Sequence, residues 1–284
     1  QRTDDPVASG VVSRTWLWGQ ETFHSAYEPY VETQHGSRLV FYYDKSRMEV
    51  TDPHDDRAQQ WYVTNGLLVV ELITGQLQLG DDTFQERGAA AVNIAGDPDD
   101  TGGPTYASFA TLLNLPPIGA NETILLTTDR DGTVNANSHL AEYGVTGGPY
   151  VEETRHRVAS VFWDYLNSSG PIASSEGLTT GQLFDPWFYA TGYPITEAYW
   201  ARVKVKDVVQ DVLIQCFERR CLTYTPGNIP GWEVEMGNVG RHYHSWRYSS
   251  ALAPPQLPGS TPPSRTTADT NHPQRLTWRP IDDY

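Results

Sequence analysis

Two stretches of the chain place a carboxylate between a Trp and a Tyr at the same spacing. Residues 18–30 and residues 187–199 both read Trp, nine residues, Glu, one residue, Tyr. Two carboxylates such as Glu28 and Glu197 perform acid–base or glycoside-cleaving chemistry when their environments differ. A catalytic centre needs one asymmetric set of groups, so a motif that occurs twice favours a role in the fold. We therefore interpret both Glu residues as structural acceptors of backbone N–H groups at strand corners.

The similarity continues beyond these motifs in the same order. Residues 37–53 and 210–226 both contain an apolar run, an aromatic residue, an acid, a base and an Arg, and then a Thr that leads to a Pro. Further on, Trp61 and Trp232 each begin a Trp-x-Val-x-x-Gly block. Three matched blocks in one order indicate an internal repeat. We expect Trp18 and Trp187, like the two Glu residues and the later Trp pair, to occupy equivalent places in two similar β units.

A calcium-binding loop is a weaker candidate site. Its oxygen ligands would be Asp129, Asp131, Thr133 and Asn135, at alternate positions around Gly132. Calcium loops use hard oxygen ligands at this spacing, but the Glu that ends such a loop is missing. A simple Asp-Gly turn is the favoured interpretation.

Other catalytic patterns are missing from the sequence. His242 and His244 would share one face of a strand, but two His residues are too few to define a metal site. The chain has no G-x-S-x-G, no H-E-x-x-H, no phosphate-binding Gly loop and no C-x-x-C-H. We therefore expect no nucleotide, metal or haem cofactor, and no enzyme activity.

Composition restricts the partners. The 284 residues carry a formal net charge of −15, and an acidic surface repels nucleic acid and anionic membranes. No apolar run approaches the roughly 18 residues that cross a bilayer. At 38% hydrophobic residues the chain is typical of a globular protein. The chain begins with Gln and shows no leader, which favours a mature secreted protein after signal cleavage.

The two cysteines agree with an extracellular location. Cys216 and Cys221 lie between β-prone segments, so a turn at Glu218 and Arg219 places them opposite each other in a hairpin. Directly opposed residues have Cα atoms about 4.5–5.5 Å apart, which a disulfide can span. The spacing differs from C-x-x-C redox and zinc patterns. We predict a structural disulfide, of the kind that persists outside the cytosol.

The periodicity predicts a β-rich α+β fold, with two pseudo-repeated antiparallel β units, intervening helices and an extended Pro-rich tail. Residues 65–80 read as a hairpin around Thr74 and Gly75, and residues 198–215 alternate as strands do. Helices are predicted at residues 105–117 and 151–170. The predicted segments are an N-terminal extension (1–14), the first β unit (15–104), a linking region with helices (105–182), the second β unit (183–250) and the tail (251–284).

The tail is rich in Pro, Ser and Thr until its last residues. Leu276, Trp278 and Ile281 supply apolar anchors at near-alternate positions. Prolines stiffen the segment and reduce the entropy that it loses on ordering. We expect the tail to dock as an added strand on a neighbouring copy, although docking on its own domain would satisfy the same groups.

Residues 16–248 resemble uncharacterised secreted bacterial proteins from thermophile-rich lineages. The resemblance is carried by residues 211–248, which contain the Cys hairpin, and by the Tyr-Tyr-Asp-Lys-Ser-Arg segment at 42–47 with the Trp block that follows. It implies export and a shared fold. It implies no catalytic residues.

Two classes of function remain. The first is an extracellular structural protein, such as a self-assembling surface or filament subunit whose partner is another copy of itself. The second is a secreted glycan-binding or glycan-cleaving cell-wall module, which the aromatic residues and abundant carboxylates favour.

Overall fold

The computed structural model describes residues 2–33, 35–50, 56–59 and 62–249. Its first sheet is an antiparallel meander in which each strand pairs with the next along the chain. A short helix, α1 (Asp5–Ala8), precedes it. The strands are β1 (His24–Pro29), β2 (Ser37–Tyr43), β3 (Ser46–Val50) and β4 (Thr64–Asn65).

The second sheet has six strands in the order β16-β15-β14-β13-β7-β8. Four of them form another antiparallel meander, and β7 joins β13 in parallel. Lys206 and Asp207 both have left-handed backbone at the β13–β14 turn, as a two-residue hairpin requires. The strands are β7 (Leu126–Thr128), β8 (Val134–Ala136), β13 (Tyr199–Val205), β14 (Val208–Cys216), β15 (Cys221–Tyr224) and β16 (Val234–Met236).

Three two-stranded sheets and several short helices complete the described part of the chain. The hairpins are β5 (Gln76–Gln78) with β6 (Phe84–Glu86), β9 (Gly147–Val151) with β10 (His156–Ala159), and β11 (Ser169–Ser174) with β12 (Gly177–Gln182). The short helices are η1 (Ala107–Thr111), η2 (Ser138–Tyr143) and α3 (Ser160–Leu166). The β-rich character expected from the sequence is therefore present.

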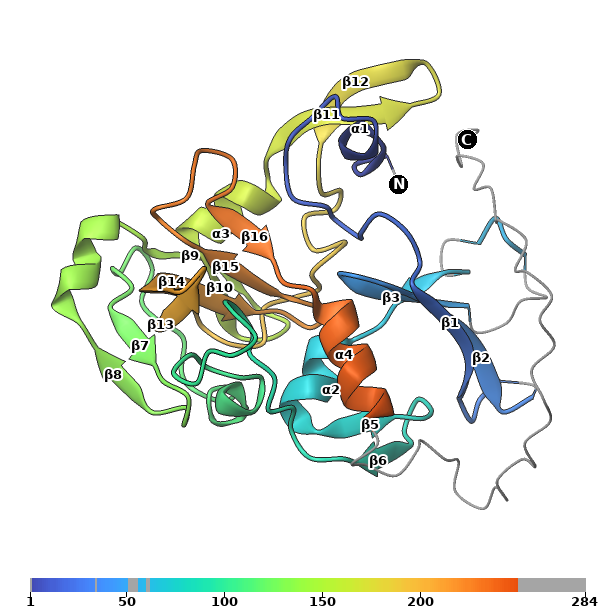
Figure 1. The fold of residues 1–284 in the computed structure, drawn as a ribbon, viewed down its shortest axis with the longest axis horizontal. Coiled ribbons are helices and arrows are strands. Elements are labelled where there is room, and N and C mark those ends of the chain that lie inside the picture. The colour runs from blue at the N-terminus through green and yellow to red at the C-terminus, as the bar shows by residue number, and fades with distance from the viewer. Residues whose placement is uncertain (1, 34, 51–55, 60–61, 250–284) are drawn as a thin grey trace.

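Helices α2 (Leu68–Thr74) and α4 (Val239–Tyr248) lie between the two sheets (Figure 1). The hairpin predicted at residues 65–80 is wrong, because this apolar run forms α2 and ends at Gly75 with left-handed backbone. Most side chains of α2, including that of Glu71, are buried, so apolar residues occur around the helix and the sequence shows no clear helical period. His242 and His244 belong to α4 and not to a strand.

Two other helix predictions need correction. Within residues 151–170 the chain first completes the β9–β10 hairpin and becomes helical only over α3. Arg155 has left-handed backbone in that hairpin's turn, which a continuous helix does not allow. Within residues 105–117 the helical part is the 3₁₀ helix η1. Pro116 and Pro117 follow it in a segment without regular secondary structure, as prolines that end a helix do.

The centre of the six-stranded sheet, around the buried halves of β13 and β14, is covered on both faces. Along β14, Val212 and Ile214 belong to the apolar core shared with α2 and α4, whereas Leu213 belongs to a second core shared with α3. Along β13, Ala201 and Trp200 divide between these two cores in the same way. This sheet is therefore the central layer of the molecule, with one core on each side.

The two meanders have the same order of elements, four strands and then a helix. The residues that precede α2 and α4, Leu67 and Asn238, have nearly the same backbone angles (φ −79° and −83°, both with ψ 53°). The residues that the sequence spacing predicts to be equivalent in the two meanders differ from those that occupy the same ladder positions in the two sheets. When the turns at residues 44–45 and 218–219 are aligned, Glu28 takes the ladder position of Ala201, and not that of Glu197.

Two further observations concern the same predictions. Trp18 packs edge-on against Tyr189, whereas Trp187 packs against Trp163, so these two Trp residues have unlike surroundings. Trp61 lies outside the described residues, so its comparison with Trp232 stays a prediction. Among the described helices, none combines the length and the apolar character that crossing a bilayer requires.

Candidate functional site

The largest group of buried charged side chains among the described residues lies where β1, β2, β3, α2 and α4 meet. We call it the Arg–Glu cluster. It contains three arginines and three glutamates whose side chains are at most a few per cent exposed, so its formal charges balance. Its members are Glu28, Arg38, Arg47, Glu49, Glu71 and Arg247.

Glu28 is the carboxylate of the first Trp–Glu–Tyr motif, and every contact of its side chain is with the interior. Its Oε1 accepts hydrogen bonds from the hydroxyls of Tyr42 (2.5 Å) and Tyr248 (2.7 Å) and lies 3.1 Å from Nε of Arg247. Its Oε2 lies 3.4 Å from a guanidinium nitrogen of Arg47. Burial opposes ionisation, but the two guanidinium groups and the Tyr hydroxyls outweigh it and lower the pKa of Glu28.

Arg47 connects Glu28 to the carboxylates on β3 and α2. Its guanidinium donates to Glu49 from two nitrogens (2.8 and 2.5 Å) and to Glu71 (3.3 Å). It also donates to the hydroxyl of Tyr243 (2.6 Å), and that hydroxyl donates to Glu71 (2.6 Å). Removing one member of such a buried network leaves the remaining charges unpaired, so the Arg–Glu cluster joins the first sheet to both helices.

The Arg–Glu cluster is unsuited to acid–base catalysis. A catalytic carboxylic acid needs a raised pKa and access to substrate, whereas the pKa of Glu28 is lowered and its side chain is 1% exposed. Burial raises the pKa of Tyr42, its nearest hydroxyl partner, well above the ordinary range, so this hydroxyl keeps its proton. The interpretation of Glu28 as structural agrees with these contacts, although its donors are side chains and not backbone N–H groups.

Glu197, the carboxylate of the second motif, lies elsewhere. Its Oε1 accepts from the backbone N–H of Arg157 (2.9 Å) and lies 3.0 Å from Nδ1 of His156. Its Oε2 accepts from the backbone N–H of Ile118 (3.2 Å). Glu197 therefore holds two backbone segments in place, as the sequence analysis proposed. The two motif carboxylates belong to separate sites and do not form a pair.

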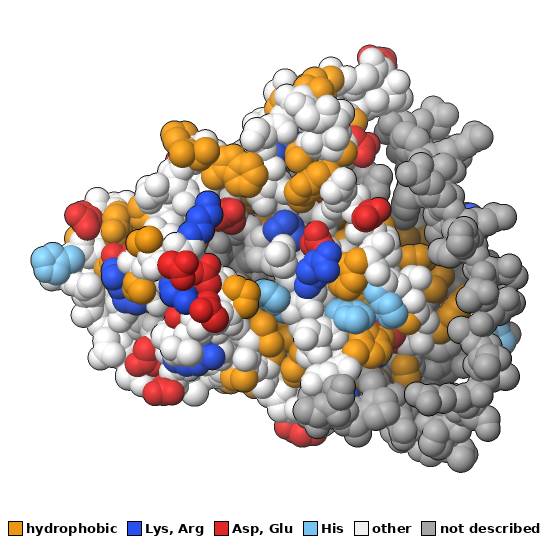
Figure 2. Space-filling view, in the orientation of Figure 1, with side chains coloured by type: hydrophobic (Ala, Val, Ile, Leu, Met, Phe, Trp, Pro, Cys, Tyr) orange, Lys and Arg blue, Asp and Glu red, His pale blue; other side chains and the backbone are white. Residues whose placement is uncertain are grey.

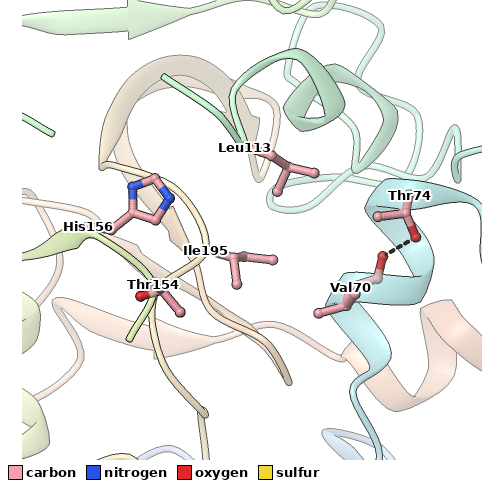
Figure 3. Close-up of a pocket in the computed structure, with 6 residues that line it drawn as sticks. All are labelled: Val70, Thr74, Leu113, Thr154, His156 and Ile195. Carbon is pink, nitrogen blue, oxygen red and sulfur yellow. Dashed lines mark hydrogen bonds between the residues drawn. The ribbon is translucent and has the colours of Figure 1, made fainter. Parts of the chain in front are cut away.

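His156 lines a cavity of about 270 Å³ between α2 and the loops beside β10. Figure 3 shows the His156 ring with one nitrogen directed toward Ile195 and the other directed away from the cavity. The remaining lining is mostly apolar, with Val70 and Leu113 on the far side. The hydroxyl of Thr74 is used within α2, where it donates to the carbonyl of Val70. A carboxylate–histidine pair can polarise a water or a hydroxyl, and Thr154 places in this lining a buried hydroxyl that has no hydrogen-bond partner among the described residues. The lining includes no second carboxylate.

The loop of the calcium candidate contains the expected Asp-Gly turn. Oδ1 of Asp129 accepts from the backbone N–H groups of Asp131 (2.9 Å) and Thr133 (3.0 Å), and the loop joins β7 to β8. Asn135 lies in β8 and pairs with Thr127. Within the part of the chain that the structure describes, no three His, Cys, Asp or Glu side chains gather as a metal site. The Asp-Gly turn favoured from the sequence accounts for this loop.

A second cavity of about 270 Å³ lies on the sheet beside that loop, and its lining is more polar. Its walls include an ion pair between Arg202 and Asp211 (3.1 Å), and Tyr143 donates to the other oxygen of Asp211 (3.2 Å). Trp200 forms part of the floor and packs against the Tyr143 ring. Further polar lining comes from Thr127, Thr128, Asp129, Asn135 and Asn137. We call this cavity the polar pocket.

The remaining predicted residues divide into two groups. Cys216 and Cys221 form the predicted disulfide between directly paired residues of β14 and β15, and Phe217 and Arg220 close the turn as expected. The proposed assembly anchors Leu276, Trp278 and Ile281 lie outside the described residues.

Sequence reasoning missed the Arg–Glu cluster and His156. The signal for the Arg–Glu cluster is the presence of Arg38, Arg47 and Glu49 inside strands that are otherwise apolar and aromatic. Charged residues inside such strands are ordinarily assigned to a solvent-facing side. His156 gives no comparable signal, because its partner Glu197 is far away in the sequence. Comparisons with family models, with curated proteins and with solved structures find no match to this chain.

Proposed function

We propose that this chain is an extracellular structural protein, a subunit of a self-assembling surface layer or filament. The observation that carries the proposal is the use of the two motif carboxylates. Glu28 and Glu197 are buried, and all their described contacts hold elements of the fold together. The repeated residues that have catalytic potential therefore serve architecture. The disulfide between Cys216 and Cys221 supports an oxidising location.

The proposal includes a duplicated β unit. The shared order of four strands and a helix supports it, and so do the matching backbone angles before α2 and α4. The first turn of α2 donates from Val69 to the carbonyl of Glu218, and the first turn of α4 donates from Gly240 to that of Asp44. The helix of each unit therefore has its first N–H groups capped by the hairpin turn of the other unit. These reciprocal contacts would hold the two small units together as one rigid building block.

The proposed connector between blocks is the segment 251–284, which docks on a neighbouring copy through Leu276, Trp278 and Ile281. Its length supports this contact. An extended chain spans up to about 3.3–3.6 Å per residue, so the segment reaches beyond the body from which it starts. A head-to-tail contact that does not close into a ring produces a filament.

Electron microscopy of the full chain, together with its native mass, tests the proposal. We expect polymers of the full chain and folded monomers or small oligomers after deletion of residues 251–284. A variant with Leu276, Trp278 and Ile281 all replaced by Ser keeps the tail length and should also lose the polymer. A polymer that persists in both variants would remove the tail as connector. A full chain that never polymerises would contradict the structural function itself.

The polar pocket favours a second candidate function, the binding of a cell-wall glycan. Sugars are bound by planar polar side chains that hold neighbouring hydroxyls, beside an apolar or aromatic surface. Arg202, Asp211 and Asn135 supply the polar groups, and the apolar part of the lining comes from Leu140, Trp200 and Ala201. The volume of the pocket, about 270 Å³, is below the usual range for drug-sized ligands, so a ligand as small as a single sugar unit is expected.

Pull-down on purified peptidoglycan and other insoluble glycans tests this alternative. Binding that Asn135→Ala with Arg202→Ala reduces at least about tenfold would support it, with Asn114→Ala as a control at an exposed position outside the pocket. Equal retention of the full chain and the double variant on every glycan would exclude the polar pocket as the binding site.

A further inference from the structure

The hairpin of β11 and β12 extends from the body as a two-stranded arm (Figure 1). Its six residue pairs run from Ser169 with Gln182 to Ser174 with Gly177. A two-stranded hairpin is marginally stable on its own in water. The arm is supported on one side, where α1 packs against β11.

The outer edge of β11 is covered by the N-terminal segment. The backbone N–H of Ala173 donates to the carbonyl of Arg2 (2.7 Å), and the carbonyl of Pro171 accepts from the Arg14 guanidinium (2.9 Å). Residues 171 and 173 therefore turn their backbone groups away from β12. In an antiparallel ladder, the partner of such a residue also turns its groups outward.

The partners of these two residues are Thr180 and Leu178 on β12. Their N–H and C=O groups face away from β11 and form the outer edge of the arm. Among the residues that the structure describes, none hydrogen-bonds to these groups across that edge. Leu178 is 56% exposed, and Thr179 and Thr180 are exposed as well.

Open strand edges pair with other strands unless something prevents it, and the other described edges are protected. β4, β5, β6, β8 and β16 have three residues or fewer. β1 carries Pro29 and the inward-facing charge of Glu28. β9 exchanges hydrogen bonds with residues 121 and 122, and the N–H groups of Arg157 and Ala159 in β10 donate to side chains.

Along β12, the carbonyl of Gln182 at the base of the arm accepts from the Arg2 guanidinium (3.2 Å), and the rest of the strand has none of these protections. Its six residues include no charged side chain and no proline, and its outer groups are exposed. The surface over the arm in Figure 2 is mostly white, with few charged side chains. A second copy can approach this edge without the repulsion that a net charge of −15 creates elsewhere.

We propose that β12 is a self-association edge that pairs antiparallel with β12 of a second copy, on a two-fold axis at Thr179. In this register Leu178 lies opposite Thr180 of the second copy, and Thr180 lies opposite its Leu178. The outward N–H and C=O groups of both residues then bond reciprocally, and the two arms form one four-stranded sheet. The contact is isologous, as in most two-fold dimers. It goes beyond the proposed function because it needs neither the tail nor a filament.

Disulfide trapping tests the register. Both natural cysteines are bonded to each other, so Thr179→Cys introduces a single free thiol. Facing residues of this kind have Cα atoms about 4.5 Å apart, within the range of a disulfide. Mild oxidation of the full chain should convert most of this variant into a covalent dimer. Ile229→Cys, which is exposed and outside any strand, should stay largely monomeric. Equal cross-linking of both variants would overturn the proposal.

A charge test gives a second readout that does not need a thiol. Leu178→Lys with Thr180→Lys places like charges opposite each other and should raise the dimer dissociation constant at least about tenfold. Val11→Lys with Ile229→Lys adds the same charge at other exposed positions and should leave the dimer dissociation constant unchanged. Analytical ultracentrifugation measures both. A wild-type protein that is monomeric at high micromolar concentration, or a dimer that the first pair leaves intact, would overturn the inference.

Deletion of residues 251–284 separates this inference from the proposed filament. The truncated Thr179→Cys protein should still cross-link. Cross-linking without filaments in the full chain would support the β12 edge and contradict the filament. Filaments without cross-linking would support the filament and contradict the β12 edge. Loss of cross-linking on truncation would assign the contact to the tail and overturn the inference.

Discussion

Asp44, in the turn between β2 and β3, and Glu218, in the turn between β14 and β15, make the same kind of contact, because the backbone carbonyl of each accepts hydrogen bonds from the first turn of a helix that follows the other meander. Asp44 receives the N–H groups of Gly240 and Arg241 in α4, and Glu218 receives those of two residues in α2. The first N–H groups of a helix lack partners within the helix, so each hairpin turn supplies the missing acceptor. The two halves therefore stabilise each other directly.

The first prediction concerns Gly240, the residue at the α4 side of this contact. A Cβ at this position would lie 1.9 Å from the carbonyl oxygen of Tyr43. We expect Gly240→Ala to lower the free energy of unfolding by about 1–3 kcal/mol, as overpacking does. Helix propensity alone would make Gly240→Ala stabilising, so a loss of stability would indicate the steric contact. Urea denaturation measures it, with Gly227→Ala as the control because a Cβ there meets nothing within 4 Å. An unchanged midpoint for Gly240→Ala would contradict the close approach.

The second prediction concerns the balance of the Arg–Glu cluster. Glu28→Gln removes the negative charge that faces Arg47 and Arg247 in the interior. We expect a loss of about 3–5 kcal/mol in the free energy of unfolding, because an unpaired buried charge remains. Glu21→Gln removes an exposed carboxylate and should change it by less than about 0.5 kcal/mol. Similar urea midpoints for the two variants would show that the Arg–Glu cluster contributes little.

The third prediction is a pH dependence that arises from His242. Burial, and then the nearby charge of Lys45, lower the pKa of His242 to about 4. Between this value and the unfolded value near 6.5, the unfolded chain binds the proton and the folded chain does not. Stability must therefore decrease as the pH falls from about 6.5 to about 4, by at most about 3 kcal/mol.

The variant His242→Gln isolates this contribution. Gln keeps an acceptor for the hydroxyl of Tyr106, which lies 3.1 Å from Nδ1 of His242, and it does not titrate. The difference in unfolding free energy between the two proteins should change across this window and stay flat above pH 7. Glu28, whose pKa is lowered, loses its contribution only at more acidic pH and affects both proteins alike. Parallel curves would contradict the prediction.

The fourth prediction concerns the disulfide. Unfolded, unreduced protein should show no reactive thiol, and reduction should release two. Replacement of both Cys216 and Cys221 by Ala should lower the free energy of unfolding by about 2 kcal/mol, because the bond closes a short loop. Thiol titration and thermal melting measure the two effects. Two thiols before reduction would show that the bond does not form.

Local sequence was sufficient where neighbours along the chain decide the structure. The hairpin that contains Cys216 and Cys221 follows from β-prone flanks around a short turn. The Asp-Gly turn at Asp129 follows from a side chain that bonds its own backbone two residues on. The alternating pattern of residues 198–215 gives β13 and β14. In these segments the hydrogen-bond partners lie within a few residues or across one turn, so composition and spacing determine them.

Tertiary structure decided the rest, because the partners are far apart in the chain. The apolar run of α2 fits a buried strand or a buried helix, and the carbonyl of Glu218 lies at the helical N-terminus. The Arg–Glu cluster joins Glu28 to Arg247, and Glu197 meets His156 across a separate core. The sequence does not reveal which charged residues are buried, because burial of a charge is favourable only when the fold supplies its counter-charges. By itself the sequence determined a β-rich, disulfide-bonded chain, and the packing of its two halves determined which of its charged residues are structural.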